Sequence, residues 1–169
     1  MSINIITLAF IEYKTKRFYI SQSPSNDNIE QFIFSLKQHN IKHVVRLCKS
    51  TYDYKLIENE EIKFYDMEIP DGSVPSKQII EQWNTLVDNI NVNEHILVHC
   101  VAGLGRSPLM VTISLINEKM DPFDAIKLIR KQRPGSINSK QLEFLVNYKP
   151  YQNKKKKQLN FLNFFICRY

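Results

Sequence analysis

Residues 98–108 read VHCVAGLGRSP, a segment that places a cysteine, two glycines and an arginine within seven consecutive positions. The apolar residues 96–98 that lead into it predict a buried strand. After it, apolar residues recur at spacings of four and three, at Leu109, Ile113 and Ile116, as on one face of a helix. The segment is therefore predicted to form a tight loop between a strand and the N-terminus of a helix.

This Cys-x5-Arg loop has the features of an anion-binding site. Glycine lets the backbone curl so that its N–H groups turn inward, and a helix N-terminus adds positive potential, so a dianionic phosphate would fit. The same field would lower the pKa of Cys100 from about 8.5 toward the ~3.5–7.5 range of activated cysteines. The planar guanidinium of Arg106 matches two phosphate oxygens. The predicted cradle consists of Val101, Ala102, Gly103, Leu104, Gly105 and Arg106.

Three other interpretations account for less of the loop. A structural cysteine at an ordinary strand-to-helix turn would leave His99, Arg106 and both glycines unexplained. A nucleotide-binding GxxxxGK[ST] loop is excluded because no Gly-Lys-Ser/Thr follows. A sulfurtransferase also places a cysteine in an anion-binding loop, but the neighbouring Arg106-Ser107 pair favours phosphate chemistry. We therefore interpret Cys100 as the nucleophile of a cysteine-dependent phosphatase.

The segment HCVAGLGRSP resembles the signature of protein tyrosine phosphatases, and VAGLGR is similar to the phosphatase of regenerating liver group, also called type IVA. Three other segments agree: VVRLCKSTYD at 44–53, Asp-Gly at 71–72 and INSKQLEFL at 137–145. The similarity extends over about residues 5–150 and lies within the cysteine-dependent dual-specificity phosphatases. It implies a protein tyrosine phosphatase-like fold, in which helices flank a central, mostly parallel sheet of about five strands.

The order of strand and helix patterns also predicts an α/β fold, with the active loop at the carboxyl end of a strand. Strands are expected at residues 3–11, 17–21, 43–48, 62–65 and 95–99. Helices are expected after the turn-rich residues 23–27, from Ser76, after the Cys100 loop, from Asp121-Pro122 to about Gln132, and from Asn138 to about Tyr148. Gln141, three residues after Asn138, suggests a capping box.

Cleavage of a phosphate ester by a thiolate needs a proton donor for the departing oxygen, and a carboxylate on a mobile loop can supply it. The resemblance assigns this role to Asp71, although an Asp-Gly pair is also an ordinary turn. Asp66 and Glu68 are the rival acids. Met67-Glu68 stands where the family usually has Trp-Pro, so closure of this loop is expected to differ from that of the family.

Two neighbours of the loop have expected roles in catalysis. The Ser107 hydroxyl can donate to the sulfur as the thiolate leaves the phosphoenzyme. The resembled group usually has alanine here, so the resemblance implies faster turnover in this chain. His99 is expected to orient the loop and support the thiolate, or else to be a packed histidine at the end of a strand.

Cys48 has two open interpretations. As a free cysteine at the end of a strand, it could be a small core residue. The resemblance instead implies a redox role, in which it forms a disulfide with Cys100. No metal or other cofactor is expected, because the four histidines form no metal-ligand pattern.

The expected substrate is a phosphoprotein. The loop residues Val101, Ala102 and Leu104 are apolar, whereas inositide phosphatases tend to place lysines there, so tyrosine or dual-specificity activity is favoured. The resemblance also implies a rival function, a binding module that docks a cyclin-M-type magnesium transporter over its active site. An Arg-Arg-Gly segment assists that docking in the family, and here Arg133-Pro134-Gly135 lacks the second charge.

Composition predicts one phosphatase domain at residues 1–150 and a basic, apolar tail at 151–169. The chain has 169 residues, 43% hydrophobic and 24% charged, as in an ordinary globular domain. Its net charge of +6 lies mainly in the tail, which has five basic residues and no acid, whereas the body has 18 basic and 17 acidic residues. This distribution favours an anionic membrane surface, reached through Lys154, Lys155, Lys156 and Lys157, and argues against nucleic acid as a partner.

The expected location is the cytoplasm, at the inner membrane face. Three cysteines do not make an extracellular disulfide framework, and neither a signal peptide nor an apolar run near ~20 residues is evident. Cys167 is followed by two residues only, one short of the C-a-a-X box that the family carries.

Overall fold

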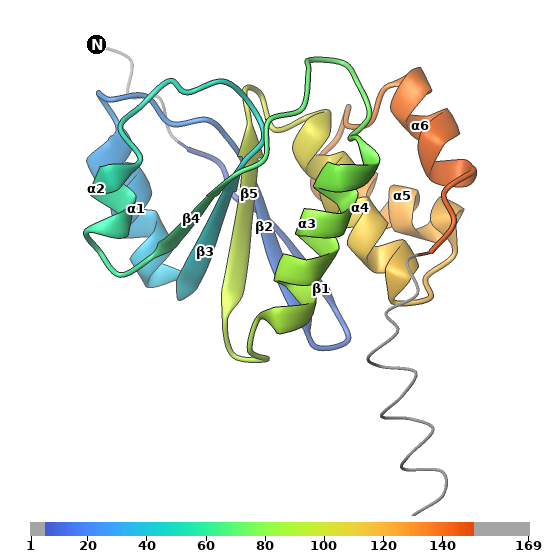
Figure 1. Cartoon of the computed structure of the whole chain (residues 1–169), viewed down its shortest axis with the longest axis horizontal. Helices are drawn as coiled ribbons and strands as arrows, with labels where there is room; N and C mark the ends of the chain where they lie inside the picture. Colours follow the sequence, from blue (N-terminus) through green and yellow to red (C-terminus); the bar gives the residue numbers. More distant parts are fainter. Residues whose placement is uncertain (1–5, 151–169) are drawn as a thin grey trace, which may run out of the picture.

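The centre of the molecule is a five-stranded sheet with the strand order β1-β2-β5-β3-β4 (Figure 1). The computed structural model describes residues 6–150. The strands are β1 Ala9–Tyr13, β2 Lys16–Gln22, β3 Ile41–Arg46, β4 Lys63–Asp66 and β5 His95–Cys100. β1 and β2 form an antiparallel hairpin, and the other three pairs are parallel. The predicted α/β architecture with a mostly parallel sheet of five strands is confirmed.

The predicted first strand, 3–11, is wrong in its boundaries over the described residues, and its residues 3–5 lie outside them. The ladder with β2 begins at Ala9 and continues to Tyr13, where the turn residue Lys14 has a φ of 53°. The apolar residues Ile6 and Leu8 instead pack against a core cluster outside the ladder. Apolar side chains that bury their surface without pairing produce the same sequence pattern as a strand.

Six helices lie in the described part of the chain, residues 6–150. They are α1 Ile29–Gln38, α2 Lys55–Glu58, α3 Lys77–Asn89, α4 Arg106–Asn117, α5 Pro122–Gln132 and α6 Ser139–Val146. The predicted caps are confirmed, because Ser76, Asp121 and Asn138 accept hydrogen bonds from the first turns of α3, α5 and α6. The single turn α2 was missed, since four residues are too few to show a helical period.

The two faces of the sheet are covered by different helices: α1 and α2 lie on one face, and α3 to α6 lie on the other (Figure 1). Neighbouring residues of one strand supply both cores, because side chains alternate along it. On β5, Leu97 belongs to the core under α1, whereas Val98 belongs to the core under α4. Helix α4 is the most enclosed element, and all its residues from Arg106 to Ile116 are buried.

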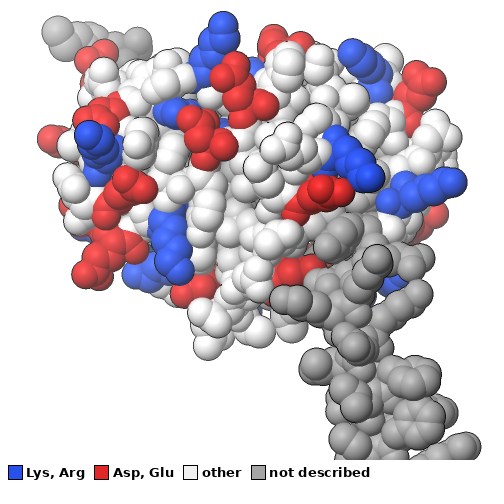
Figure 2. Space-filling view, in the orientation of Figure 1, with Lys and Arg blue, Asp and Glu red and all other residues white. Residues whose placement is uncertain are grey.

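The surface of the described residues mixes both signs of charge, as Figure 2 shows for one face. No helix within residues 6–150 has the length and apolar character needed to cross a membrane. Lys154–Lys157, for which membrane contact is expected, and Cys167, which falls one residue short of a C-a-a-X box, lie outside the described residues.

Candidate active site

The Cys100 loop joins the carboxyl end of β5 to the N-terminus of α4, where the sequence placed it. Gly103 has a φ of 69°, and a Cβ at this position would lie 2.5 Å from the carbonyl oxygen of Ser21. Both the conformation and the close approach therefore require glycine. Gly105 is the N-cap of α4, so Arg106 and Ser107 occupy the first turn of the helix.

Four successive carbonyls of the loop accept hydrogen bonds from the surrounding structure. Arg133 donates to Ala102 and Gly103 at 3.0 and 3.2 Å, and backbone amides donate to Val101 and Leu104 at 3.0 and 2.8 Å. In a trans peptide the N–H points away from the C=O. The amides of residues 102–105 are therefore directed away from these partners, as an anion cradle requires. Arg133 was not predicted to act on this loop.

Opposing effects act on the pKa of Cys100, which is 2% exposed. Burial raises the pKa, but hydrogen bonds from the Ser107 hydroxyl and from the amides of Ser107 and Gly103, together with the charge of Arg106, lower it below its ordinary value. The buried Ser107 hydroxyl has no nitrogen or oxygen partner among residues 6–150. Its hydrogen-bonding capacity is thus left for the sulfur of Cys100.

Arg106 is the buried cation of the site, with 5% of its surface exposed. Its Nη1 donates to the carbonyl of Ile69 at 3.1 Å, which fixes the guanidinium against the loop after β4. Its Nη2 lies 2.9 Å from Oδ1 of Asp71, whose side chain is 91% exposed. An ion pair with such an exposed partner contributes little stability, so an incoming phosphate can replace it.

The other two candidate acids lie elsewhere. Asp66 binds the guanidinium of Arg46 through both carboxylate oxygens, at 2.5 and 3.1 Å. Arg46 itself is almost buried, and its guanidinium lies 5.0 Å from the centre of the Phe64 ring. Glu68 is exposed and does not line the cavity at Cys100. Of the three carboxylates, Asp71 alone contacts Arg106 among the described residues.

His99 is fully buried behind the loop. Its Nε2 lies 2.6 Å from the hydroxyl of Tyr52, and its ring meets the edge of Phe32. Burial lowers the pKa of His99 to about 3, and the backbone of Cys100 opposes only part of this effect. The ring is therefore neutral at physiological pH and supplies no positive charge to the thiolate. Its packing matches the second interpretation, a histidine packed at the end of a strand. Tyr52 was not predicted.

Cys48 lies two residues beyond β3 and belongs to the same buried cluster as Cys100. Both thiols are free. Burial raises the pKa of Cys48, the charge of Arg106 lowers it, and the charge of Cys100 raises it again. The Cys48 thiol therefore lies within the electrostatic field of the site and is protonated when Cys100 is a thiolate.

A cavity of about 340 Å³ opens above these groups. It is lined by Asp71, Gly72, Cys100, Val101, Ala102, Leu104, Gly105, Arg106, Gly135, Asn138 and Gln141. The side chains of Val101 and Leu104 stand 58% and 39% exposed at its edge. Asn138 and Gln141 were recognised in the sequence as a helix cap only, and no local pattern indicates that they also reach the active site.

Comparison with known proteins identifies the family. Residues 19–154 match the catalytic domain of dual specificity phosphatases. A protein tyrosine phosphatase type IVA 3 from Bos taurus is 41% identical over 145 residues, which cover 84% of this chain and 84% of the relative. The PRL-1 phosphatase of Drosophila melanogaster is 40% identical over 145 residues, covering 84% and 82% of the two chains.

Solved structures agree with this assignment. A protein tyrosine phosphatase from Leishmania major has a TM-score of 0.77 and 30% identity, and the match covers 84% of this chain and 98% of the other. A kinase associated phosphatase, at 22% identity and a TM-score of 0.69, shares the fold over 92% of this chain and 96% of its own. The chain therefore belongs to the dual specificity phosphatases and, among them, to the type IVA protein tyrosine phosphatases.

Proposed function

We propose that this phosphatase works in two steps through a phosphocysteine on Cys100. The thiolate attacks phosphorus, Arg106 and the loop amides hold the phosphate oxygens, and Asp71 protonates the leaving oxygen. Water then hydrolyses the phosphocysteine. One observation carries the proposal: a cysteine with a lowered pKa, a buried arginine and a carboxylate meet at one cavity.

Ser107 is proposed to assist the second step. Its hydroxyl is buried beside the sulfur and can donate to the thiolate as the phosphate departs. This hydrogen bond stabilises the leaving group of the hydrolysis, so it should speed release of the enzyme from the intermediate. His99 is proposed only to hold the end of β5 in place through its contact with Tyr52, because its ring is neutral.

The proposed substrates are phosphotyrosine and other phosphorylated residues of proteins. The apolar side chains of Val101 and Leu104 at the cavity edge suit a peptide better than a polyanionic inositide. Initial rates on a panel of phosphopeptides and phosphoinositides test this, with Cys100→Ser as the inactive control. We expect activity on phosphotyrosine peptides that Cys100→Ser abolishes. Higher kcat/KM for phosphoinositides would overturn the assignment of substrate.

We also propose redox control through Cys48. Peroxide would oxidise the Cys100 thiolate to a sulfenic acid, and the Cys48 sulfur would then attack the Cys100 sulfur, forming the disulfide and releasing the hydroxyl as water. Support comes from the burial of both sulfurs in one cluster and from their mutual electrostatic influence. Peptide mapping after peroxide treatment should find Cys48 joined to Cys100, and finding only Cys100 sulfinic acid would contradict the proposal.

Residues 1–150 are proposed as the catalytic domain and 151–169 as a segment that brings it to the cytoplasmic membrane face. Four lysines near an anionic leaflet contribute about 1 kcal/mol each, a weak and salt-sensitive attraction that needs a second signal. The apolar residues that follow Lys157 would provide it. Binding to vesicles containing phosphatidylserine should fall with salt and disappear when residues 153–169 are deleted. Equal binding by the truncated chain would exclude this role.

The second candidate function is docking of a cyclin-M-type magnesium transporter over the active site. The exposed Val101 and Leu104 favour a protein contact at this edge. Arg133 is bonded to the loop carbonyls, and Pro134 offers no charge beside it. Affinity for the transporter domain should therefore be modest and should rise in Pro134→Arg. Absence of binding by both the wild type and Pro134→Arg would leave catalysis as the sole function of this face.

A further inference from the structure

The first turn of α6 touches the loop that carries Asp71. Asn138 donates from Nδ2 to the carbonyl of Gly72 at 3.2 Å, and Gln141 donates from Nε2 to the carbonyl of Ser73 at 3.1 Å. These two carbonyls belong to the residues directly after Asp71. The same two side chains also form the capping box of α6. Each uses its amide oxygen to accept a hydrogen bond within the cap and its amide nitrogen to donate to the Asp71 loop.

Gln141 is held in one place by its surroundings. It is fully buried, and its Oε1 accepts the backbone N–H of Asn138 at 3.2 Å. On its other side lies the phosphate loop, where a Cβ added to Gly105 would meet the Gln141 amide at 3.3 Å. Gln141 therefore fills the space between the phosphate loop and the Asp71 loop. Its contacts with both loops fix the position of the Asp71 loop relative to the phosphate loop.

After Ile69, the Asp71 loop makes few other hydrogen bonds or ion pairs with the rest of the described structure. Within the described part of the chain, residues 70–75 bond to other elements through the Asp71 and Arg106 pair and through Asn138 and Gln141. The amide of Ser73 bonds within the loop, to Pro70. The ion pair is exposed on the Asp71 side and the bond from Asn138 is exposed as well, so the bond from the buried Gln141 is the best protected of the three.

We infer that Asn138 and Gln141 are positioning residues that hold the Asp71 loop closed over the phosphate loop. We call their two hydrogen bonds to this loop the α6 latch. The inference rests on the proposed function, since it assigns to the latch the placement of the proton donor. The latch stays in place when phosphate enters and takes Arg106 from Asp71, because neither of its bonds uses Arg106. Asp71 would thus remain near the leaving oxygen throughout the first step.

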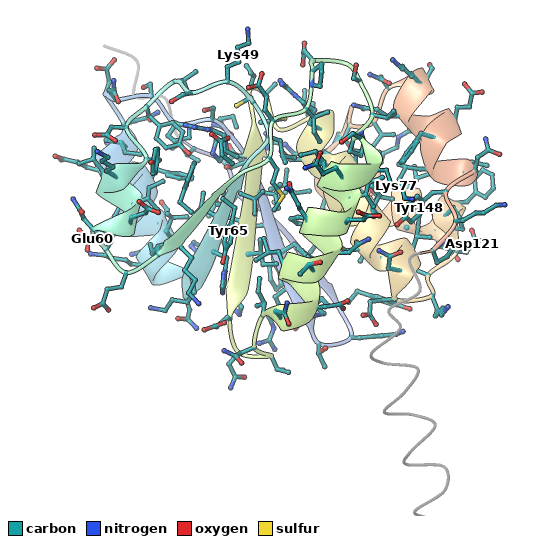
Figure 3. All side chains as sticks on the ribbon, in the orientation of Figure 1. Lys49, Glu60, Tyr65, Lys77, Asp121 and Tyr148 are labelled. Carbon is teal, nitrogen blue, oxygen red and sulfur yellow. The ribbon has the colours of Figure 1, made fainter. Side chains whose placement is uncertain are left out.

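The sharpest variant is Asn138→Ser. Serine is a good N-cap, so α6 keeps its start, but its side chain is too short to reach Gly72. Asn138 is exposed, so folding is not at risk. Asp121→Ser makes the matched change at the N-cap of α5, which lies away from the loop before α3 (Figure 3). Gln141→Met, which removes the other bond at similar size, is the second variant.

Kinetics separate the latch from a general effect on folding. We expect kcat/KM of Asn138→Ser to fall about fivefold, the loss of one average hydrogen bond, on a phosphotyrosine peptide. On a fluorinated methylumbelliferyl phosphate, whose leaving group needs no proton, it should stay within about twofold of wild type. In an Asp71→Asn background, Asn138→Ser should cause no further loss, because both changes remove the same proton transfer. Asp121→Ser should match wild type throughout.

Hydrogen exchange gives a readout that does not depend on activity. Peptides covering residues 67–76 should exchange faster in Asn138→Ser and in Gln141→Met than in wild type, while peptides of β5 stay unchanged. Unchanged exchange in this loop would overturn the latch, and so would an equal loss on both substrates or an additive loss with Asp71→Asn. If wild type and Cys100→Ser were equally inactive, the proposed function would fail, and the exchange result would still judge the latch.

Discussion

The sulfur of Cys100 shows how single residues set the chemistry of this site. Burial alone would keep the thiol protonated. Hydrogen bonds from Ser107 and from the Gly103 amide, together with the charge of Arg106, reverse that effect. The largest of the contributions that lower the pKa comes from a neutral donor, the Ser107 hydroxyl, ahead of the amides and of Arg106. His99, which the sequence suggested as a support for the thiolate, contributes no charge because burial keeps its ring neutral.

Replacing Ser107 by alanine tests this balance. Loss of a hydrogen bond to a charged group costs about 1.5–3 kcal/mol, so steady-state turnover should fall about tenfold or more. Pre-steady-state traces should show a burst of the first product, because the phosphoenzyme then accumulates. The pH midpoint of Cys100 alkylation by iodoacetamide should move upward. An unchanged steady-state rate would show that the hydroxyl is not used.

Replacing Asp71 by asparagine tests the assignment of the acid. General acid catalysis contributes about 10²-fold or more, so kcat/KM should fall by that order on phosphotyrosine peptides and much less on aryl phosphates with good leaving groups. Glu68→Gln is the matched control, since Glu68 is exposed on the same loop and does not line the cavity. If Glu68→Gln produced the leaving-group dependence instead, Asp71 would not be the acid.

At the scale of elements, the phosphate loop depends on side chains from distant segments. Arg133, just after α5, holds two of its carbonyls, and Gln141 of α6 packs against Gly105. Arg133→Gln should weaken inhibition by vanadate about tenfold, because two hydrogen bonds that orient the cradle are lost. Lys131→Gln, an exposed change in the last turn of α5, should leave inhibition unchanged. Equal inhibition constants for all three proteins would show that the loop keeps its shape without Arg133.

These elements also show what a sequence can and cannot predict. The caps of α3, α5 and α6 were predicted because a cap is a local pattern within four residues. The bonds from Arg133, Asn138 and Gln141 to the two loops were not, since each joins residues at least 30 positions apart. Their partners are backbone carbonyls, which any residue provides, so no residue type marks the contact.

At the scale of the whole molecule, the parallel sheet explains why the distant motifs meet. The carboxyl ends of β3, β4 and β5 lie at the same edge of the sheet, and the segments that follow them carry Cys48, Asp71 and the phosphate loop (Figure 1). Alternating strand and helix patterns predicted the fold and the active loop at the carboxyl end of a strand. The roles of Cys48 and Asp71 beside that loop came from the family resemblance. The neutral state of His99 could not be predicted, because it depends on burial by both Tyr52 and Phe32 from other elements.

Burial of His99 has a consequence for the stability of the whole protein. The unfolded chain binds a proton on this residue below about pH 6.5, whereas the folded protein binds it only near pH 3. In this window the unfolded state holds more protons, so the free energy of unfolding falls as the pH falls, by about 1.4 kcal/mol per pH unit from this residue. Burial also lowers the pKa of His43, which adds to the slope in the same direction.

Urea unfolding of wild type and His99→Gln between pH 6 and pH 4 measures this contribution. His99→Gln should be less stable at pH 6, because it loses the bond to Tyr52, but its stability should decline less steeply as the pH falls. The slope from His43 remains in both proteins and cancels in the comparison. Parallel pH profiles would mean that His99 is protonated in the folded state.

The most direct test is rapid chemical quench of the reaction with a phosphotyrosine peptide, followed by mapping of the phosphoryl group on the protein. In Ser107→Ala, whose second step is slowed, phosphate should appear on the sulfur of Cys100 as fast as the dephosphorylated peptide is formed, and it should then decay at the steady-state turnover rate of that variant. Cys100→Ser should neither accumulate this species nor turn over. Release of peptide by Ser107→Ala without phosphate on Cys100, or turnover by Cys100→Ser at the wild-type rate, would contradict the mechanism.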